Sequence, residues 1–222
     1  MNAMQKEFVD FMLEKHVLKF GDFITKSGRP TPYFINTGCY DDGSSIARIG
    51  AFYADCLHEH ITDDFDILYG PAYKGIPLAT TTAIALSQRH NINVNYSFNR
   101  KEAKDHGEGG NIVGRIPQSG DKVVIVEDVI TAGTSIRESI AIMNKLGNID
   151  IVGIIVSVDR MERGSVSDKT AINEIEDQFG IPVFPVVNIK DVATYIHDEY
   201  PGGSSIIDDA MIEKIHNRIV IA

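Results

Sequence analysis

Two adjacent carboxylates, Glu127 and Asp128, end an apolar run in the stretch VVIVEDVITAGTS (123–135). Neighbouring acids repel each other, so the pair costs free energy unless a ligand makes use of it. Carboxylate oxygens are acceptors only, and they match the donor hydroxyls of a diol such as that of a ribose. The two acids therefore predict a site that binds a sugar ring through its hydroxyl groups.

The turn that follows the acids has the composition of a phosphate site. It precedes a helical pattern, so its backbone N–H groups would point outward at the positive end of a helix dipole. Its hydroxyl donors are Thr131, Thr134 and Ser135. A ligand with a phosphate beside a diol would satisfy both halves of the stretch. The alternative is that the acids only cap the next helix, although their place directly after a buried strand disfavours this.

Strand patterns alternate with helical patterns along the chain. Strands are expected within 65–75, 93–98, 121–129, 149–160 and 183–187, and 27–38 is expected to be a loop that feeds a short strand. Helices are expected at 4–16, about 44–60, 76–90, 134–147 (closed by Gly147), near 168–179, about 188–198 and about 206–219. Nearly continuous apolar strands in this order predict an α/β fold, with a parallel sheet covered by helices on both faces. Ligands bind beyond the carboxyl ends of such strands, where the two acids lie.

Composition restricts the class of protein. The chain has 222 residues, which favours one domain with an appendage over two equal domains. Its formal net charge is -10 and its pI is about 5.1, which argues against nucleic acid or an anionic membrane as the partner. An anionic substrate must then be held by a few local cations and backbone amides.

The two cysteines, Cys39 and Cys56, show no metal-binding or disulfide spacing, and we expect free thiols in a reducing cytoplasm. The N-terminal segment is interrupted by charges and has no apolar core of a secretion signal. The longest apolar stretch, at 151–158, is too short to cross a bilayer. We therefore expect a cytoplasmic protein without a membrane span.

The stretch EDVITAGTS resembles the phosphoribosyl pyrophosphate motif of type I phosphoribosyltransferases, in which two acids precede a small-residue turn ending in Gly-Thr. Glu127 stands where that family more often has Asp, which keeps the charge and adds one methylene. The resemblance implies that the substrate contacts the whole stretch: Glu127, Asp128, Val129, Ile130, Thr131, Ala132, Gly133, Thr134 and Ser135.

Four further segments resemble orotate phosphoribosyltransferases in matching order and spacing: KSGRPTPYFINTG (26–38), GPAYKGIPLA (70–79), RKEAKDHGEGGNIVG (100–114) and SVDRMERG (157–164). The resemblance covers about residues 5–200. It implies the type I phosphoribosyltransferase fold, with a mainly parallel central sheet flanked by helices. It also implies a single domain over 1–222, in which a small N-terminal hood of about 1–40 and C-terminal additions surround a core of about 41–190.

The reaction implied is displacement of pyrophosphate from phosphoribosyl pyrophosphate by N1 of orotate, forming orotidine 5′-monophosphate in pyrimidine biosynthesis. Charge grows on the leaving pyrophosphate, so catalysis needs cations more than a nucleophile. The resemblance assigns this role to four residues of a closing loop: Arg100, Lys101, Lys104 and His106. The alternative is a solvated loop of mixed charge, but Gly107, Gly109 and Gly110 favour a lid.

The remaining roles also come from the resemblance. Lys26, Tyr73 and Lys74 would face phosphoribosyl pyrophosphate. Phe34, Ile35, Thr131 and Arg160 would meet orotate, with the guanidinium of Arg160 on its carboxylate. Arg160 could instead form a surface ion pair with Glu162. The resemblance further implies Mg²⁺ held mainly by substrate and water, and a homodimer with shared active sites.

Two other functions remain open at this point. One is a phosphoribosyltransferase for a purine or uracil, against which Arg160 and the PYFINTG segment argue. The other is a regulator that senses phosphoribosyl pyrophosphate, binds nucleic acid and catalyses nothing. The acidic pI argues against the regulator, because nucleic-acid binding needs a basic surface.

Overall fold

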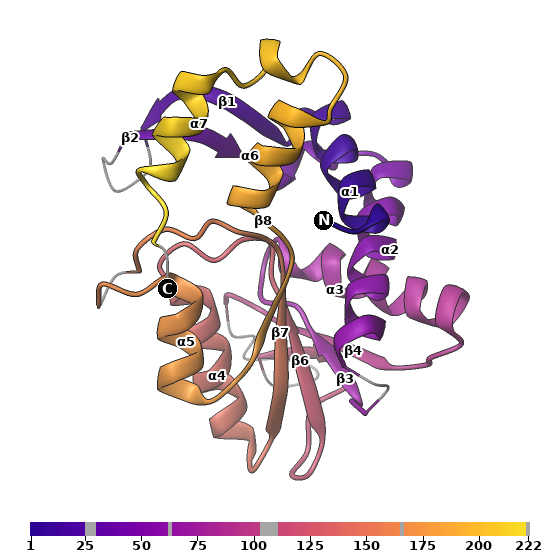
Figure 1. The fold of residues 1–222 in the computed structure, drawn as a ribbon. Coiled ribbons are helices and arrows are strands. Elements are labelled where there is room, and N and C mark those ends of the chain that lie inside the picture. Colours follow the sequence, from indigo (N-terminus) through magenta and orange to yellow (C-terminus); the bar gives the residue numbers. More distant parts are fainter. Residues whose placement is uncertain (25–29, 62–63, 103–110, 165–166, 221–222) are drawn as a thin grey trace.

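The computed structural model describes residues 1–24, 30–61, 64–102, 111–164 and 167–220. Its centre is a six-stranded sheet with the order β5-β4-β3-β6-β7-β8 (Figure 1). In that order the strands are Ile112–Gly114, Asn95–Asn99, Ile67–Tyr69, Lys122–Val126, Asp150–Asp159 and Val183–Asn188. Every neighbouring pair is parallel except β4 and β5, which are antiparallel. This confirms the predicted α/β fold with a mainly parallel sheet.

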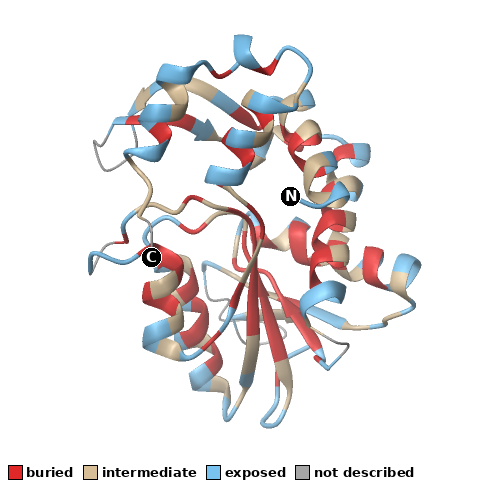
Figure 2. Ribbon diagram, in the orientation of Figure 1, coloured by how far each residue is buried: buried red, intermediate tan, exposed pale blue. Residues whose placement is uncertain are grey.

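Helices cover both faces of the sheet, as the sequence predicts. One face packs against α1 (Ala3–Glu14), α2 (Gly43–His60) and α3 (Gly75–Ala85), and the other against α4 (Thr134–Leu146) and α5 (Ala171–Phe179) (Figure 1). Side chains alternate between the two faces of a strand, so Val124 joins the first core while Val123 and Ile125 join the second. The central strands are therefore buried on both sides (Figure 2).

A small hairpin lies beyond the carboxyl ends of the central strands, at the top of Figure 1. It pairs β1 (Leu18–Ile24) with β2 (Pro30–Ile35) in antiparallel register, next to α6 (Ile189–Asp198) and α7 (Asp209–His216). The predicted short strand is β2. We did not predict β1, because a register shift between Phe20 and Phe23, with Gly21 at a φ of 148°, breaks its alternation.

Three other elements differ from the expectation. The helix expected over 76–90 ends at Ala85 and continues as a π-helical turn to His90, which Asn91 closes in a left-handed conformation. Strand β5 was not predicted, because its three residues follow a charged, glycine-rich segment. The last helix, α7, is shorter than the expected 206–219. Gly147 ends α4 at a φ of 144°, as predicted.

Two simpler expectations can also be compared with the structure. Cys39 and Cys56 are both free thiols, as predicted. Across the residues that the structure describes, there is no helix of the length and apolar character that crossing a membrane requires.

Candidate active site

The acid pair lies immediately after β6, and its backbone is fixed by both neighbouring layers. The N–H of Glu127 donates to the carbonyl of Ile155 on β7 (3.0 Å). The buried hydroxyl of Tyr53, from α2, donates to the carbonyl of Glu127 (2.8 Å), and that of Ser157 donates to the carbonyl of Asp128 (2.6 Å). Two consecutive carbonyl groups are thus held by side chains, which orients the two carboxylates after the strand has ended.

Asp128 is held as a carboxylate by several donors. Its Oδ2 accepts hydrogen bonds from Lys74 Nζ (2.8 Å) and Thr37 Oγ1 (2.7 Å), and its Oδ1 accepts one from the N–H of Val129 (2.8 Å). Burial by itself would raise the pKa of Asp128. The hydrogen bond and charge of Lys74, followed by the other donors, outweigh burial and lower that pKa. Asp128 is therefore the stronger acid of the pair.

Glu127 has the opposite environment. It is only 7% exposed, its Oε2 accepts a hydrogen bond from the Ser135 hydroxyl, and its Oε1 accepts one from the N–H of Asp128 (2.9 Å). Burial raises the pKa of Glu127 to about 7, and the neighbouring charge of Asp128 acts in the same direction. Adjacent acids with pKa values displaced in opposite directions are a sign of a functional site.

The turn after the acids leads into α4 without a side-chain cap. Gly133 occupies the N-cap position at a φ of 71°, and no side chain of the described residues hydrogen-bonds the first amides of the helix. The alternative, in which the two acids only cap this helix, is therefore excluded. Thr131, Ala132 and Thr134 are exposed. The uncapped amides and these hydroxyls can serve a phosphate, because helix N-termini favour anions.

A second turn lies between β3 and α3. The peptide bond between Ala72 and Tyr73 is cis. The N–H of Ala72 donates to Asn99 Oδ1 at the end of β4 (2.9 Å). Gly70 is required here, since a Cβ on it would lie 2.0 Å from the carbonyl oxygen of Gly75. Tyr73 is exposed, and Lys74 reaches across to Asp128.

The loop after β4 starts beside this turn. The Lys101 ammonium lies 5.2 Å from the centre of the Tyr73 ring, a cation–π distance. The N–H of Arg100 donates to the carbonyl of Asn111 (2.7 Å), so the two sides of the loop meet at its base. Lys104 and His106 lie outside the described residues, as does Lys26. Their assigned roles stay predictions.

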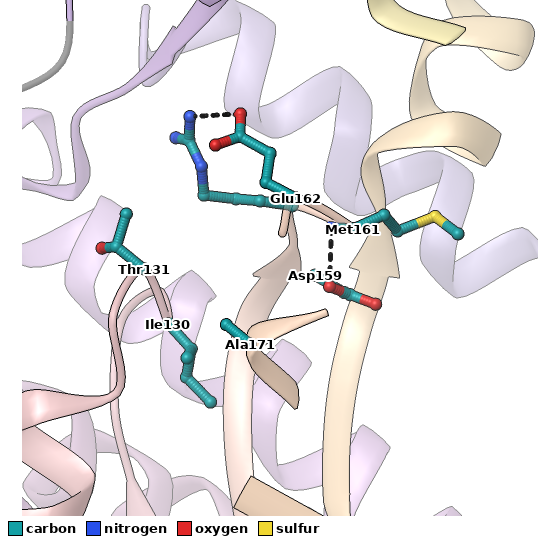
Figure 3. Close-up of a pocket in the computed structure, with 7 residues that line it drawn as sticks. Ile130, Thr131, Asp159, Met161, Glu162 and Ala171 are labelled. Carbon is teal, nitrogen blue, oxygen red and sulfur yellow. Dashed lines mark hydrogen bonds and ion pairs between the residues drawn. The ribbon is translucent and has the colours of Figure 1, made fainter. Parts of the chain in front are cut away.

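Arg160 lies just beyond β7 and lines a narrow pocket with Ile130, Thr131, Asp159, Met161, Glu162 and Ala171 (Figure 3). It is 9% exposed, and its guanidinium lies 4.6 Å from the centre of the Tyr33 ring. One terminal nitrogen donates to Glu162 Oε1 (2.8 Å). The alternative pairing with Glu162 therefore exists, but it is buried rather than on the surface. Thr131 brings the turn that precedes α4 into the same pocket.

Phe34 lies within β2, and Ile35 is the last residue of that strand. As neighbours in a strand, their side chains point to opposite faces of the hairpin. Phe34 is 46% exposed, and its ring contacts that of Phe23, with 5.7 Å between the ring centres. Ile35 packs partly into the core. Because strand residues alternate, Tyr33 and not Phe34 faces Arg160. The role of Phe34 and Ile35 in flanking a base stays a prediction.

Several residues at the site were not singled out from the sequence. They are Tyr33, Thr37, Tyr53, Asn99 and Ser157. Thr37 and Tyr33 lie within the segment 26–38, which resembles the family. The sequence therefore indicated that this segment belongs to the site, but it did not show which residues these two side chains contact. Tyr53 on α2 donates to the carbonyl of Glu127, and Asn99 on β4 accepts from the N–H of Ala72. These contacts depend on how the helix and the strand pack in the fold, which the spacing of residues in the sequence does not show.

Comparison with known proteins agrees with this arrangement. Residues 37–188 match the model of the family described as the phosphoribosyl transferase domain. The chain is 49% identical to an orotate phosphoribosyltransferase of Clostridium beijerinckii, over 97% of this chain and 96% of that protein. It is 50% identical to one of Vibrio parahaemolyticus, over 90% and 91%.

The crystal structure of orotate phosphoribosyltransferase from Francisella tularensis has the same fold. Its TM-score is 0.81 at 36% sequence identity, with 95% of this chain and 96% of that chain covered. The chain therefore belongs to the phosphoribosyltransferase family and, within it, to the orotate phosphoribosyltransferases. This confirms the family that the motifs indicated.

Proposed function

We propose that this enzyme transfers the 5-phosphoribosyl group from phosphoribosyl pyrophosphate to N1 of orotate, releasing pyrophosphate and forming orotidine 5′-monophosphate for pyrimidine biosynthesis. The position of Thr131 carries this proposal. Thr131 belongs to the turn that precedes α4 and also lines the pocket of Arg160. A site suited to phosphate and ribose is therefore continuous with a buried guanidinium that suits a carboxylate. Orotate carries a carboxylate, whereas purine bases and uracil do not.

The geometry of the described residues and the resemblance of the motifs support the following roles. The amides and hydroxyls of 131–135 would hold the 5′-phosphate, and the charged Asp128 would accept from the ribose hydroxyls. Glu127 would stand beside it, held by Ser135. Lys74 would exchange its contact with Asp128 for the substrate. Arg100, Lys101, Lys104 and His106 would stabilise charge on the departing pyrophosphate when the loop closes.

We also propose a role for Mg²⁺, bound mainly by oxygens of phosphoribosyl pyrophosphate and by water. Mg²⁺ keeps much of its hydration and favours phosphate oxygens. In the part of the chain that the structure describes, no group of three or more His, Cys, Asp or Glu is placed to hold a metal. Substrate oxygens would supply its ligands, and the ion would neutralise pyrophosphate charge. Chelation of Mg²⁺ should abolish turnover, and its return should restore it.

The test of the reaction is direct. Incubation with orotate, phosphoribosyl pyrophosphate and Mg²⁺ should lower orotate absorbance and release one pyrophosphate for each orotate consumed. Parallel incubations with uracil, hypoxanthine and adenine are the controls. Turnover of one of these bases in preference to orotate would contradict the proposed substrate, and pyrophosphate release without any base would contradict transfer.

We further propose a homodimer in which the loop containing Lys104 closes over the site of the partner subunit. The loop is polar and glycine-rich, so it has little apolar surface with which to dock on its own subunit. Lys104→Ala and Arg160→Ala enzymes, each nearly inactive, should regain activity when unfolded and refolded together. Random pairing gives one intact site in half of the dimers, so recovery should approach about a quarter of wild-type activity per site. Heterodimers without activity would mean that each subunit closes its own loop.

A further inference from the structure

Arg160 is incompletely satisfied in its buried position. Among the described residues, its side chain makes one hydrogen bond, to Glu162, and lies against the face of the Tyr33 ring. Its Nε is buried and has no hydrogen-bond partner among the described residues. A buried donor without an acceptor is destabilising, because it has lost its hydrogen bonds to water. An incoming carboxylate would offset this cost, so the state of Arg160 before binding affects the affinity for a carboxylate.

Glu162 is the partner that sets this state, and three donors share it. Its Oε1 accepts from Arg160 (2.8 Å), from the Tyr33 hydroxyl (2.8 Å) and from Arg218 Nε (2.9 Å). Burial would raise the pKa of Glu162, but the hydrogen bond of Arg218, followed by the charge of Arg160, lowers it. Two guanidinium groups thus share one ionised carboxylate. Asp159, the other carboxylate of the pocket, accepts instead from the N–H of Met161 (2.8 Å) (Figure 3).

Arg218 reaches this cluster from the far end of the chain, just after α7. It also donates to the carbonyl of Pro30 at the start of β2. The segment that carries it pairs with the residues after β7: Ile219 forms a β-bridge with Glu162, and the N–H of Val220 donates to the carbonyl of Met161 (2.7 Å). Arg218 is therefore held in place by these contacts, and it shares Oε1 of Glu162 with Arg160 while its own terminal nitrogen also approaches Oε2 (3.4 Å).

We propose that Arg218 is a positioning residue that sets selectivity for a carboxylate-bearing base, by sharing Glu162 so that the charge of Arg160 stays available to the ligand. The proposal rests on the proposed function. Without Arg218, Arg160 would be the only cation among the described residues that hydrogen-bonds Glu162, so Glu162 would neutralise Arg160. The carboxylate of orotate would then have to compete with Glu162 for the same guanidinium.

Orotidine 5′-monophosphate and uridine 5′-monophosphate form the matched probe, because they differ only in the carboxylate. In calorimetry, Arg218→Gln should weaken binding of orotidine 5′-monophosphate about tenfold and leave binding of uridine 5′-monophosphate unchanged, as expected when a charged hydrogen-bond partner is lost. The KM for orotate should rise similarly, while the KM for phosphoribosyl pyrophosphate stays constant. Equal loss for both nucleotides, or no loss for either, would overturn the proposal.

Two further variants separate charge sharing from packing. Lys214→Gln removes a cation from the same C-terminal segment, where Lys214 pairs with Asp22 on the surface (3.0 Å), and should change neither nucleotide's affinity. Adding Glu162→Gln to Arg218→Gln removes the competing carboxylate. It should restore binding of orotidine 5′-monophosphate to within about threefold of wild type. No restoration would reject charge sharing.

Arg218→Lys keeps the charge but loses the fork of donors, so it extends the test if the Gln variant folds poorly. It should show the same selective loss, reduced to about threefold, and an unchanged ratio of the two affinities would contradict the proposal. If the wild-type protein itself does not prefer orotidine 5′-monophosphate, the proposed function fails. If the wild type has that preference and Arg218→Gln keeps it, only the role of Arg218 fails.

Discussion

The acid-pair turn (127–135) and the Arg160 cluster (Tyr33, Arg160, Glu162 and Arg218) share one pocket but are built differently. The first is a continuous segment between a buried strand and a helix. The second joins the hairpin, the end of β7 and the residues after α7, through hydrogen bonds to Glu162 from residues 129 and 56 positions away. Under the proposed function, the continuous segment would bind the phosphoribosyl group, and the assembled cluster would choose the base.

The two regions also treat charge differently. In the acid-pair turn the charged Asp128 is matched by Lys74 and by neutral donors. In the Arg160 cluster two cations share one anion. The first arrangement suits neutral hydroxyls and the second suits an anionic group, because a ligand binds best where its own charge completes the balance. Variants that affect one substrate and spare the other will test this division.

We expect the largest effect from Asp128→Asn. The amide keeps the size of the side chain but cannot accept from Lys74, Thr37 and the N–H of Val129 together. Loss of a partly buried charged acceptor should lower kcat/KM for phosphoribosyl pyrophosphate about 10³-fold, or about 4 kcal/mol. Steady-state kinetics will measure this, with circular dichroism as the control for folding. A folded variant with normal kcat/KM would remove Asp128 from the substrate site.

Arg160→Ala should act on the other substrate. Orotate binding should weaken by about 2–4 kcal/mol, as expected when a desolvated charge pair is lost, and binding of phosphoribosyl pyrophosphate should hardly change. Calorimetry with each ligand decides this. If both ligands lose affinity equally, the two regions do not divide the substrates between them. If neither does, Arg160 is structural.

Glu127 should make stability depend on pH. Its folded pKa of about 7 lies above the ordinary value of 4.5, so the folded protein binds the proton more tightly. This contribution to stability is full below about pH 4.5 and is lost as pH rises through 7. The free energy of unfolding of wild type relative to Glu127→Gln should therefore fall by about 1–3 kcal/mol between pH 4.5 and 8. Urea titrations at several pH values will show it, and a constant difference would mean that folding leaves the pKa of Glu127 unchanged.

The smallest expected effect belongs to Tyr53→Phe. It removes only the hydroxyl that donates to the carbonyl of Glu127 (2.8 Å). Stability should fall by about 1 kcal/mol, the usual contribution of a buried hydrogen bond. The kcat/KM for phosphoribosyl pyrophosphate should decrease a few fold, and the KM for orotate should not. Chemical denaturation will measure the stability, and steady-state kinetics will measure the two kinetic constants. If only the KM for orotate changes, the contact from α2 supports the Arg160 cluster and not the acid-pair turn.

Prediction from the sequence succeeded where the signal was local. Apolar runs and turn residues predicted the central strands and the helices between them. A strand that is buried on both faces needs a nearly continuous apolar sequence, which is easy to recognise. The stretch 123–135 predicts a strand, an acid pair and a helix N-terminus with outward-pointing amides, and the structure has a strand, the acid pair and an uncapped helix N-terminus in that order. Strand β1 was not predicted, because the bulge at Gly21 interrupts the alternation of apolar and polar residues along the strand.

The sequence by itself determined the fold class, the acid pair and the phosphate turn, because each follows from residues adjacent along the chain. Only the tertiary structure decided which acid is charged. Glu127 and Asp128 are equivalent in sequence, and burial separates their pKa values while Lys74 and Thr37 select one of them. Tertiary structure also brought Arg218 to Glu162 and thereby to Arg160, since contacts between distant segments depend on packing that no local pattern records.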